Sequence, residues 1–295
     1  MYIKFRVMKG ILLIAIGHPY YGKMAVNLAL GLKNVNPNTK ITLCYGESAI
    51  NYLNEQERSL FDDIKEIPAE YYHRAKVLKE YIKVKTYLYD LSPYDETIYL
   101  DVDMVWGTKS INELFDKLSD KNLVIQNRGF CLMAEPKEDY SWWCNIKALG
   151  EKYSIKEGKY YSFSSEFVYF KKCKEVKEFF KKAQKNYETL AIEYTMFGGG
   201  IPDELIFSLT SLQLGIEQPI EYFTPIYWEQ AENRKLSGAD LLNQFYAYSL
   251  GGASQSTKEQ TIYNNLVQYH ANKKGFVNMW KAKNKREFLP QRQRL

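Results

Sequence analysis

The residues best suited to do chemistry are two aspartates, Asp101 and Asp103, which directly follow the apolar run of residues 98–100. This run combines β-branched and aromatic side chains, as buried strands do. In an extended chain, residues two positions apart point the same way, so both carboxylates would project from one face. Two like charges this close are costly unless a cation lies between them. Such hard oxygen ligands suit Mg²⁺ or Mn²⁺, although a strand that simply runs into an acidic turn would show the same residues.

The elements that must position this pair alternate between strands and helices. We expect strands at residues 11–16, 40–45 and 98–100 and a short one at 64–67. A first helix follows the turn at residues 17–19 and stops at residues 36–38, and further helices are expected over 51–62 and 75–91. The apolar residues of the first helix recur with a period near 3.6, as an amphipathic helix requires. This β-α-β order predicts an α/β fold with a mostly parallel sheet and right-handed crossovers. Ligands of such sheets bind beyond the carboxyl ends of the strands.

The first two strand ends carry candidate nucleotide contacts. Gly17, His18 and Tyr21 follow the first strand, and Tyr45 ends the second. A tyrosine there could stack on a base, and a glycine allows close backbone approach. The chain has 25 tyrosines, however, and His18 equally fits a simple turn. Neither a dinucleotide-binding glycine fingerprint nor a P-loop is present, which argues against an oxidoreductase and a P-loop NTPase.

The second half of the chain is less regular. Residues 139–163 are rich in Tyr and Trp and could either face a sugar or fill a core. A strand over residues 161–170 carries Glu166. Three glycines at residues 198–200 then precede Pro202, Asp203 and Glu204, which read as a helix start with carboxylates at its positive end. The basic helix expected over residues 171–187 is assigned no function.

A hydrophobic strand ending in Asp-x-Asp, about a hundred residues into the chain, resembles the metal motif of nucleotide-sugar glycosyltransferases of the GT-A fold. The nearest match is family 8, the glycogenin-like and galactosyltransferase-like type. The resemblance covers the order of elements over residues 11–280. It implies a GT-A-like, Rossmann-type α/β fold with a mostly parallel central sheet, flanking helices and an irregular C-terminal acceptor region.

The resemblance also implies roles for particular residues. The metal ligands would be Asp101, Asp103 and His270, the last following an expected strand at residues 266–269. Lys85, taken as a surface residue on the preceding helix, and Lys274 would contact the donor, and Asp101 could bind its ribose instead of the metal. Asp203 and Glu166 would lie near the reacting sugar. The chain departs from the family where Asn-x-Gly is expected, since residues 164–166 are Ser-Ser-Glu, and the lysine near His270 is closer than usual.

The expected function is therefore transfer of a sugar from a nucleoside diphosphate donor, a UDP-sugar, with Mn²⁺ or Mg²⁺ and with retention of configuration. The acceptor, whether glycan, protein, lipid or modified nucleic acid, stays open. Two alternatives remain. A haloacid-dehalogenase-type phosphatase would use Asp101 and Asp103 as nucleophile and acid, but there the motif normally follows the first strand. A non-enzymatic carbohydrate-binding protein would use the aromatic middle instead.

Composition sets the outer bounds. The 295 residues are 45% hydrophobic and 25% charged, as in globular proteins. We expect one catalytic domain over residues 1–272, with a nucleotide-binding half to residue 106 and an acceptor half from 107, and a basic tail over residues 273–295. The tail could contact nucleic acid or acidic lipid, but a solvated terminus is the simpler interpretation. Four dispersed cysteines and the lack of a long apolar segment predict a cytoplasmic protein without a transmembrane segment.

Overall fold

The computed structural model describes residues 7–74, 78–197, 199–227, 240, 243–250, 257–277 and 279–281. The chain divides into two compact units, each built from three separate segments. Unit 1 comprises Met1–Leu12, Lys65–Leu100 and Lys117–Thr224, and unit 2 comprises Leu13–Ile64, Asp101–Asp116 and Pro225–Leu295. Most of the expected basic tail, residues 282–295, lies outside the described residues. The domain boundaries and the role of the tail therefore stay predictions.

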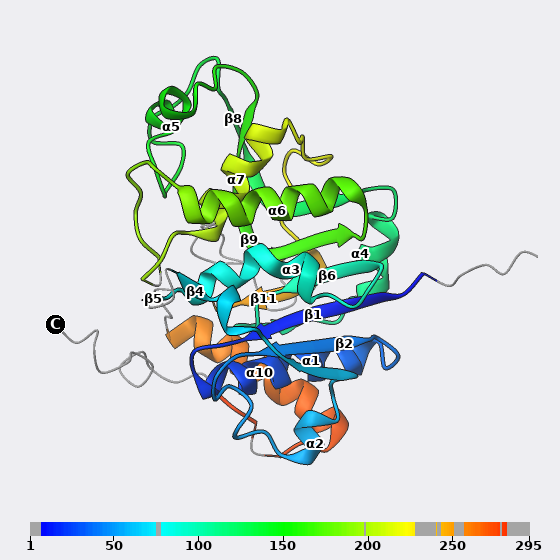
Figure 1. Ribbon diagram of the computed structural model, residues 1–295. Helices are drawn as coiled ribbons and strands as arrows, with labels where there is room; N and C mark the ends of the chain where they lie inside the picture. The colour runs from blue at the N-terminus through cyan, green and yellow to red at the C-terminus, as the bar shows by residue number, and fades with distance from the viewer. Residues whose placement is uncertain are drawn as a thin grey trace, which may run out of the picture. The chain divides into compact units, whose positions relative to one another are not determined.

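The largest sheet has six strands in the order β3-β2-β1-β6-β9-β8 (Figure 1). They are β1 (Lys9–Ala15), β2 (Ile41–Tyr45), β3 (Asp63–Glu66), β6 (Glu96–Leu100), β8 (Leu123–Leu132) and β9 (Lys159–Lys171). β9 runs antiparallel to both of its neighbours. All of β6 and all but the first residue of β1 are buried, as expected for central strands covered on both faces. The predicted α/β class with a mostly parallel central sheet is confirmed.

Unit 2 packs its helices around a small second sheet. This sheet has the order β10-β11-β7, with β10 parallel and β7 antiparallel to β11. The long helix α1 contacts both β7 and α10. The other helices and strands of unit 2 are α1 (Pro19–Val35), α2 (Glu55–Arg58), β7 (Met104–Trp106), α4 (Ile111–Lys117), β10 (Ile226–Tyr227), β11 (Ala247–Ser249) and α10 (Thr257–Lys274).

Unit 1 packs two helices against the long strand β9. α7 lies on β9, and α6 packs on α7 through its buried apolar face (Figure 1). Its helices and remaining strands are η1 (Ala69–Tyr71), β4 (His73–Arg74), β5 (Leu78–Lys79), η2 (Tyr81–Tyr87), α3 (Leu88–Leu91), α5 (Ile146–Tyr153), α6 (Lys174–Thr189) and α7 (Asp203–Leu214). Among the helices described in either unit, none has the length and apolar character needed to cross a bilayer.

The predicted helix over residues 75–91 is wrong, because tertiary contacts override its helical pattern. Residues 75–77 lie outside the described residues, and residues 78–91 instead form β5, which pairs antiparallel with β4, a 3₁₀ helix and one turn of α-helix. The ammonium group of Lys83 donates hydrogen bonds to the carbonyl oxygens of Glu70 and His73, at 3.2 and 2.6 Å. The rings of Tyr71 and Tyr87 stack 3.9 Å apart. These contacts fix η2 against the preceding turn.

Candidate active site

The carboxylate pair Asp101 and Asp103 lies just beyond the carboxyl end of β6, in the turn that leads to β7. The turn is held in place from the other side, because the carbonyl oxygen of Asp103 accepts a hydrogen bond from the amide of Leu250, at 3.0 Å. The register of β7 on β11 continues this pairing, with Met104 opposite Ser249. The pair therefore sits on a rigid strand end, as the sequence indicated.

The start of α1 lies beside these two carboxylates. The negative charges of Asp103 and Asp101 help to raise the pKa of Tyr21, although burial is the larger cause. Burial and Asp103 likewise raise the pKa of Tyr20. Gly17, with a φ of 89°, lets the chain turn into the helix, and His18 caps the helix by accepting a hydrogen bond from the amide of Tyr20. The predicted contacts Gly17, His18 and Tyr21 thus gather at one helix start, near the carboxylates.

His270 has a different position from the one predicted. It lies on helix α10, not at the end of a strand, and it is 1% exposed. One ring nitrogen, Nε2, is 2.8 Å from the backbone carbonyl oxygen of Trp106. The other, Nδ1, is 3.1 Å from the side-chain nitrogen Nδ2 of Asn34. A side chain at Gly31 would meet this ring at 3.3 Å, so a glycine in α1 makes room for it.

Both ring nitrogens of His270 face protein groups in this structure, and its predicted role as the third metal ligand stays a prediction. The described part of the chain contains no group of three or more His, Cys, Asp or Glu side chains that could hold a metal ion. Two carboxylates can still suffice. Mg²⁺ and Mn²⁺ are often bound by one or two carboxylates together with substrate phosphates and water. The donor chemistry of Asp101 and Asp103 therefore fits a metal whose remaining ligands come from the substrate.

In unit 1, the predicted site residues Lys85 and Asp203 form a buried cluster with Ser165. The ammonium group of Lys85 lies 3.0 Å from the Oδ2 atom of Asp203 and 3.1 Å from the hydroxyl of Ser165. That hydroxyl in turn donates to Asp203 Oδ2, at 2.5 Å. The side chain of Asp203 is 4% exposed and that of Lys85 is 15% exposed. The sequence placed Lys85 at the surface, whereas the structure makes it the cation of a buried ion pair.

Ser165 reaches Asp203 because β9 leaves the regular ladder at this point. Ile125 pairs with Val168 and Asn127 with Phe163, so four residues of β9 stand opposite the single residue Gln126 of β8. Ser164 and Ser165 are buried in this irregular stretch. Glu166, the other predicted catalytic residue, lies in the same stretch and is half-buried.

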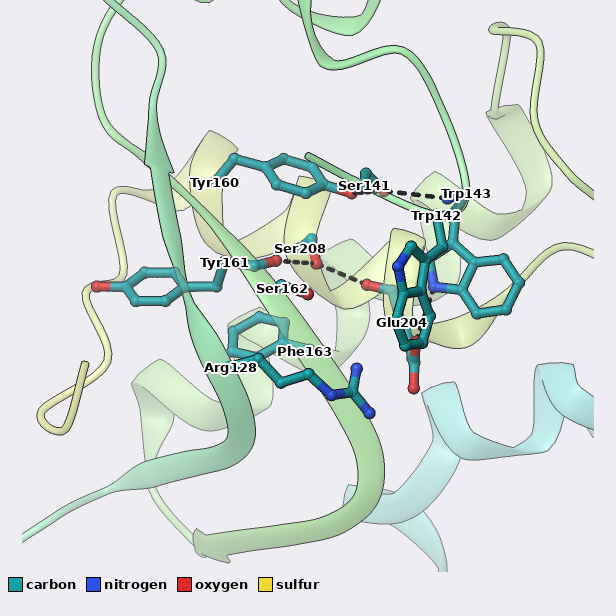
Figure 2. A pocket seen from close by; sticks show the side chains of 10 residues that line it. All are labelled: Arg128, Ser141, Trp142, Trp143, Tyr160, Tyr161, Ser162, Phe163, Glu204 and Ser208. Atoms are coloured by element: carbon teal, nitrogen blue, oxygen red, sulfur yellow. Dashed lines mark hydrogen bonds between the residues drawn. The ribbon is translucent and has the colours of Figure 1, made fainter. Parts of the chain in front are cut away.

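Next to Asp203, Glu204 lines a small pocket within unit 1 (Figure 2). Its Oε2 atom accepts a hydrogen bond from the indole nitrogen of Trp143, at 2.7 Å. Burial raises the pKa of Glu204 to about 7, with the charge of Asp203 adding to the effect and that of Arg128 opposing it. Figure 2 shows Arg128 reaching from β8 toward the side of the pocket where Glu204, Trp142 and Trp143 lie. A carboxyl group with such a pKa can exchange a proton near neutral pH.

Arg128 points into this pocket because of a bulge in β8. Between the pairs Asn127–Phe163 and Phe130–Tyr161, β8 has two residues where β9 has one. Gly129 adopts a φ of 114°, a value that favours glycine, and its amide donates to the side chain of Asn127 at 3.2 Å. An inserted residue of this kind bends a strand and redirects a side chain. Sequence analysis singled out neither Arg128 nor Glu204 for this site.

Comparison with protein-family models finds no match, and comparison with curated proteins finds none either. Solved structures do share the fold. The WbbM bifunctional glycosyltransferase, in its apo form, matches with a TM-score of 0.56 and 12% identity over 92% of this chain and 51% of that one. The glycosyltransferase GlyE of Streptococcus pneumoniae TIGR4 matches with a TM-score of 0.51 and 13% identity over 93% of this chain and 66% of that one. The chain has a GT-A-like fold.

This GT-A-like fold confirms the architecture that the Asp-x-Asp resemblance implied. At 12–13% identity it shows the fold alone, and the chain spans only about half the length of WbbM and about two thirds of GlyE. The chemistry must therefore be argued from the residues of this chain. Those residues form one set around Asp101 and Asp103 in unit 2 and another around Asp203 and Glu204 in unit 1.

Proposed function

We propose that the protein is a metal-dependent glycosyltransferase that transfers a sugar from a nucleoside diphosphate donor, a UDP-sugar, to an acceptor hydroxyl. The observation that carries the proposal is the pair Asp101 and Asp103 at the carboxyl end of the buried strand β6, in a fold that solved glycosyltransferases share. In α/β sheets, ligands bind at the carboxyl ends of the strands.

Asp101 and Asp103 would hold Mn²⁺ or Mg²⁺, and either ion, when bound, would offset the negative charge of the departing diphosphate. As an alternative to the metal, we assign Asp101 to the ribose of the donor. Around the nucleotide we assign Gly17, His18 and Tyr21 at the start of α1 and Tyr45 at the end of β2. Lys274, in the last turn of α10, is assigned to the diphosphate as a point charge.

The second set of residues would handle the sugars. The carboxylate of Asp203 accepts hydrogen bonds and is aligned by Lys85 and Ser165, so it is suited to a hydroxyl group of the donor sugar. Glu204 would bind the acceptor hydroxyl, for which a carboxyl group with a pKa of about 7 is an adaptable partner. Glu166 is assigned a polar role beside them. We further propose retention of anomeric configuration, as the family 8 resemblance implies.

The decisive experiment exposes the purified protein to a panel of nucleotide-sugars with and without Mn²⁺. A true donor at a hundred times its dissociation constant should add about 2.7 kcal/mol of stability, visible as a rise in Tm. The same mixtures should release nucleoside diphosphate, and release should stop with excess chelator. Absence of both effects for every nucleotide-sugar would overturn the proposal. NMR of the product's anomeric proton would decide between retention and inversion.

The same experiment separates the two alternatives. A phosphatase of the haloacid dehalogenase type would release inorganic phosphate from simple phosphate esters and would need no nucleotide-sugar. Its carboxylates normally follow the first strand, whereas Asp101 and Asp103 follow β6. A carbohydrate-binding protein would bind sugars without releasing diphosphate.

A further inference from the structure

The pocket beside Glu204 has an exposed aromatic ring at its rim. Trp142 is 54% exposed, whereas its neighbour Trp143 packs against the core of unit 1. The interior of the pocket has room for about one water molecule. A molecule larger than water that approaches Glu204 must therefore rest at the rim, where Trp142 lies (Figure 2).

The segment that carries Trp142 is anchored on both sides. The amide of Trp143 donates to the hydroxyl of Ser141 at 3.1 Å, and that hydroxyl lies 3.2 Å from the hydroxyl of Tyr160. The carbonyl of Trp143 accepts from the amide of Thr195, at 2.8 Å. These bonds, together with the bond of the Trp143 indole to Glu204, hold the segment in place. A surface held before binding loses little conformational entropy when a ligand arrives.

Arg128 fixes the Trp142 ring and supplies hydrogen-bond donors. Its guanidinium lies 4.8 Å from the centre of that ring, within the range of a cation–π interaction. Arginine donates only, whereas a carboxylate such as Glu204 accepts. A hydroxyl group can satisfy both, because it donates and accepts. Ser141 and Ser162, also in the pocket wall, add groups of the same kind.

An aromatic face beside paired donors and acceptors fits one class of molecule especially well. A pyranose has a face of positively polarised C–H groups, which suits the negative face of an indole, and a rim of hydroxyls. An acyl chain would fit the exposed rings of Trp142 and Phe197 but would form no hydrogen bonds with Arg128 or Glu204. The mixture of charge and aromatic surface therefore favours a carbohydrate.

We propose that Trp142 is the stacking platform for a pyranose ring of the acceptor, with Arg128 and Glu204 binding its hydroxyls. The acceptor class is then a glycan or glycoside, not a protein side chain or a bare lipid. The role of this sugar as an acceptor rests on the proposed sugar transfer. Binding of the sugar at Trp142 can be tested without any donor.

The test is saturation-transfer NMR on the full chain, with neutral methyl hexopyranosides as probes and glucitol, an open-chain polyol, as the ring-free comparison. Signals should concentrate on the C–H protons of one ring face and be absent for glucitol. Trp142→Ala should raise the dissociation constant of the best pyranoside about tenfold, and Trp142→Phe should recover most of the binding. Tyr222→Ala is the matched control, since Tyr222 is 52% exposed but lies outside the pocket wall, and it should bind as the wild type does.

Equal binding by wild type and Trp142→Ala would overturn the proposal, as would equal signals for glucitol or no signal for any pyranoside. A circular dichroism spectrum matching wild type would show that Trp142→Ala is folded. Donor hydrolysis is a separate readout. If no nucleotide-sugar is hydrolysed but the pyranoside signals depend on Trp142, the proposed transferase fails and the binding site stands. If donor is hydrolysed but Trp142 does not affect binding, the reverse holds.

Discussion

The two carboxylate pairs, Asp101 with Asp103 and Asp203 with Glu204, differ in how the protein treats their charge. Asp203 has a cation from the protein itself, the ammonium group of Lys85 at 3.0 Å, and Glu204 accepts a hydrogen bond from the indole N–H of Trp143. The charge of Asp103 instead acts on the hydroxyls of Tyr20, Tyr21 and Tyr263, whose pKa values it helps to raise.

This difference indicates two kinds of function. Asp203 and Glu204, which contact a lysine and an indole N–H, are suited to neutral, polar groups such as sugar hydroxyls. Asp101 and Asp103, at a strand end where ligands of such sheets bind, are suited to a cation that arrives with the substrate. The comparison therefore predicts that metal dependence belongs to the first pair alone, and the following substitutions can break or sharpen it.

The largest effect should come from Asp103→Ala. Loss of a metal-binding carboxylate leaves the diphosphate under-neutralised, so release of nucleoside diphosphate in Mn²⁺ should fall on the order of 1000-fold. The Tm without ligand should change little. Asp120→Ala removes an exposed aspartate of unit 1, 68% exposed, and should leave the rate unchanged. Full activity of Asp103→Ala, or of the wild type in excess chelator, would remove the metal from the mechanism.

Lys85→Ala should mainly destabilise the fold. It leaves the buried Asp203 without its cation, and removing one partner of a buried ion pair costs about 3 kcal/mol. Chemical denaturation would measure this loss. Adding Asp203→Asn to Lys85→Ala should recover part of the stability, because no charge is then left alone. Lys121→Ala, which breaks a surface pair, is the control and should leave the Tm unchanged. If Lys85→Ala were as stable as Lys121→Ala, the cluster would not be the buried ion pair described above.

A smaller effect is expected for His270→Ala. The variant loses the contacts of a buried imidazole with Trp106 and Asn34, which should cost about 2 kcal/mol of stability. The dependence of activity on Mn²⁺ should be the same as in the wild type, since both ring nitrogens of His270 already face protein groups. Tyr269→Ala, at a 42% exposed neighbour on the same helix, should change neither property. A rise in the Mn²⁺ concentration needed for half-maximal activity in His270→Ala would restore the histidine to the metal site.

The last effect concerns the pH dependence of stability. The folded-state pKa of Glu204 is about 7, above the ordinary value of 4.5, so the folded protein keeps this proton at pH values where the unfolded chain has lost it. Stability should therefore fall as the pH rises from about 4.5 to 7 and then level off. Glu204→Gln removes this contribution and leaves the charged neighbours Asp203, Lys85 and Arg128 in place. The Tm difference between Glu204→Gln and wild type should grow between pH 5 and pH 8. A constant difference would show that Glu204 has an ordinary pKa.

The sequence was sufficient for the fold and for one strand end. Apolar runs located β1, β2 and β6 because buried central strands leave little choice of residue, and Asp101 and Asp103 follow from the last of these. It failed for His270, where a run of apolar residues was taken for a strand. The buried positions Tyr263, Val267 and His270 recur at intervals of three and four, which is the helical signal that should have been followed.

The second set of residues was only half predictable. Asp203 was a candidate because the family resemblance implies an acidic residue where this loop enters a helix, and the expected helix start is present. Its contacts with Lys85 and Ser165 depend on the departure of β9 from the ladder, and irregular pairing leaves no periodic trace in a sequence. For the aromatic residues within 139–163, the sequence left two interpretations, a core role and a sugar-facing role. In the structure Trp143 packs against the core and Trp142 is exposed.

The bulge at Arg128 and Gly129 has an evolutionary consequence. Side chains of a strand alternate between its two faces, so a one-residue insertion or deletion there would turn every following residue of β8 to the opposite face. Arg128 would leave the pocket, and buried residues such as Cys131 and Met133 would exchange places with exposed ones such as Leu132. Insertions and deletions among related chains should therefore be absent from residues 127–130. They should accumulate in the segment between β8 and α5, because strand pairing does not fix its length.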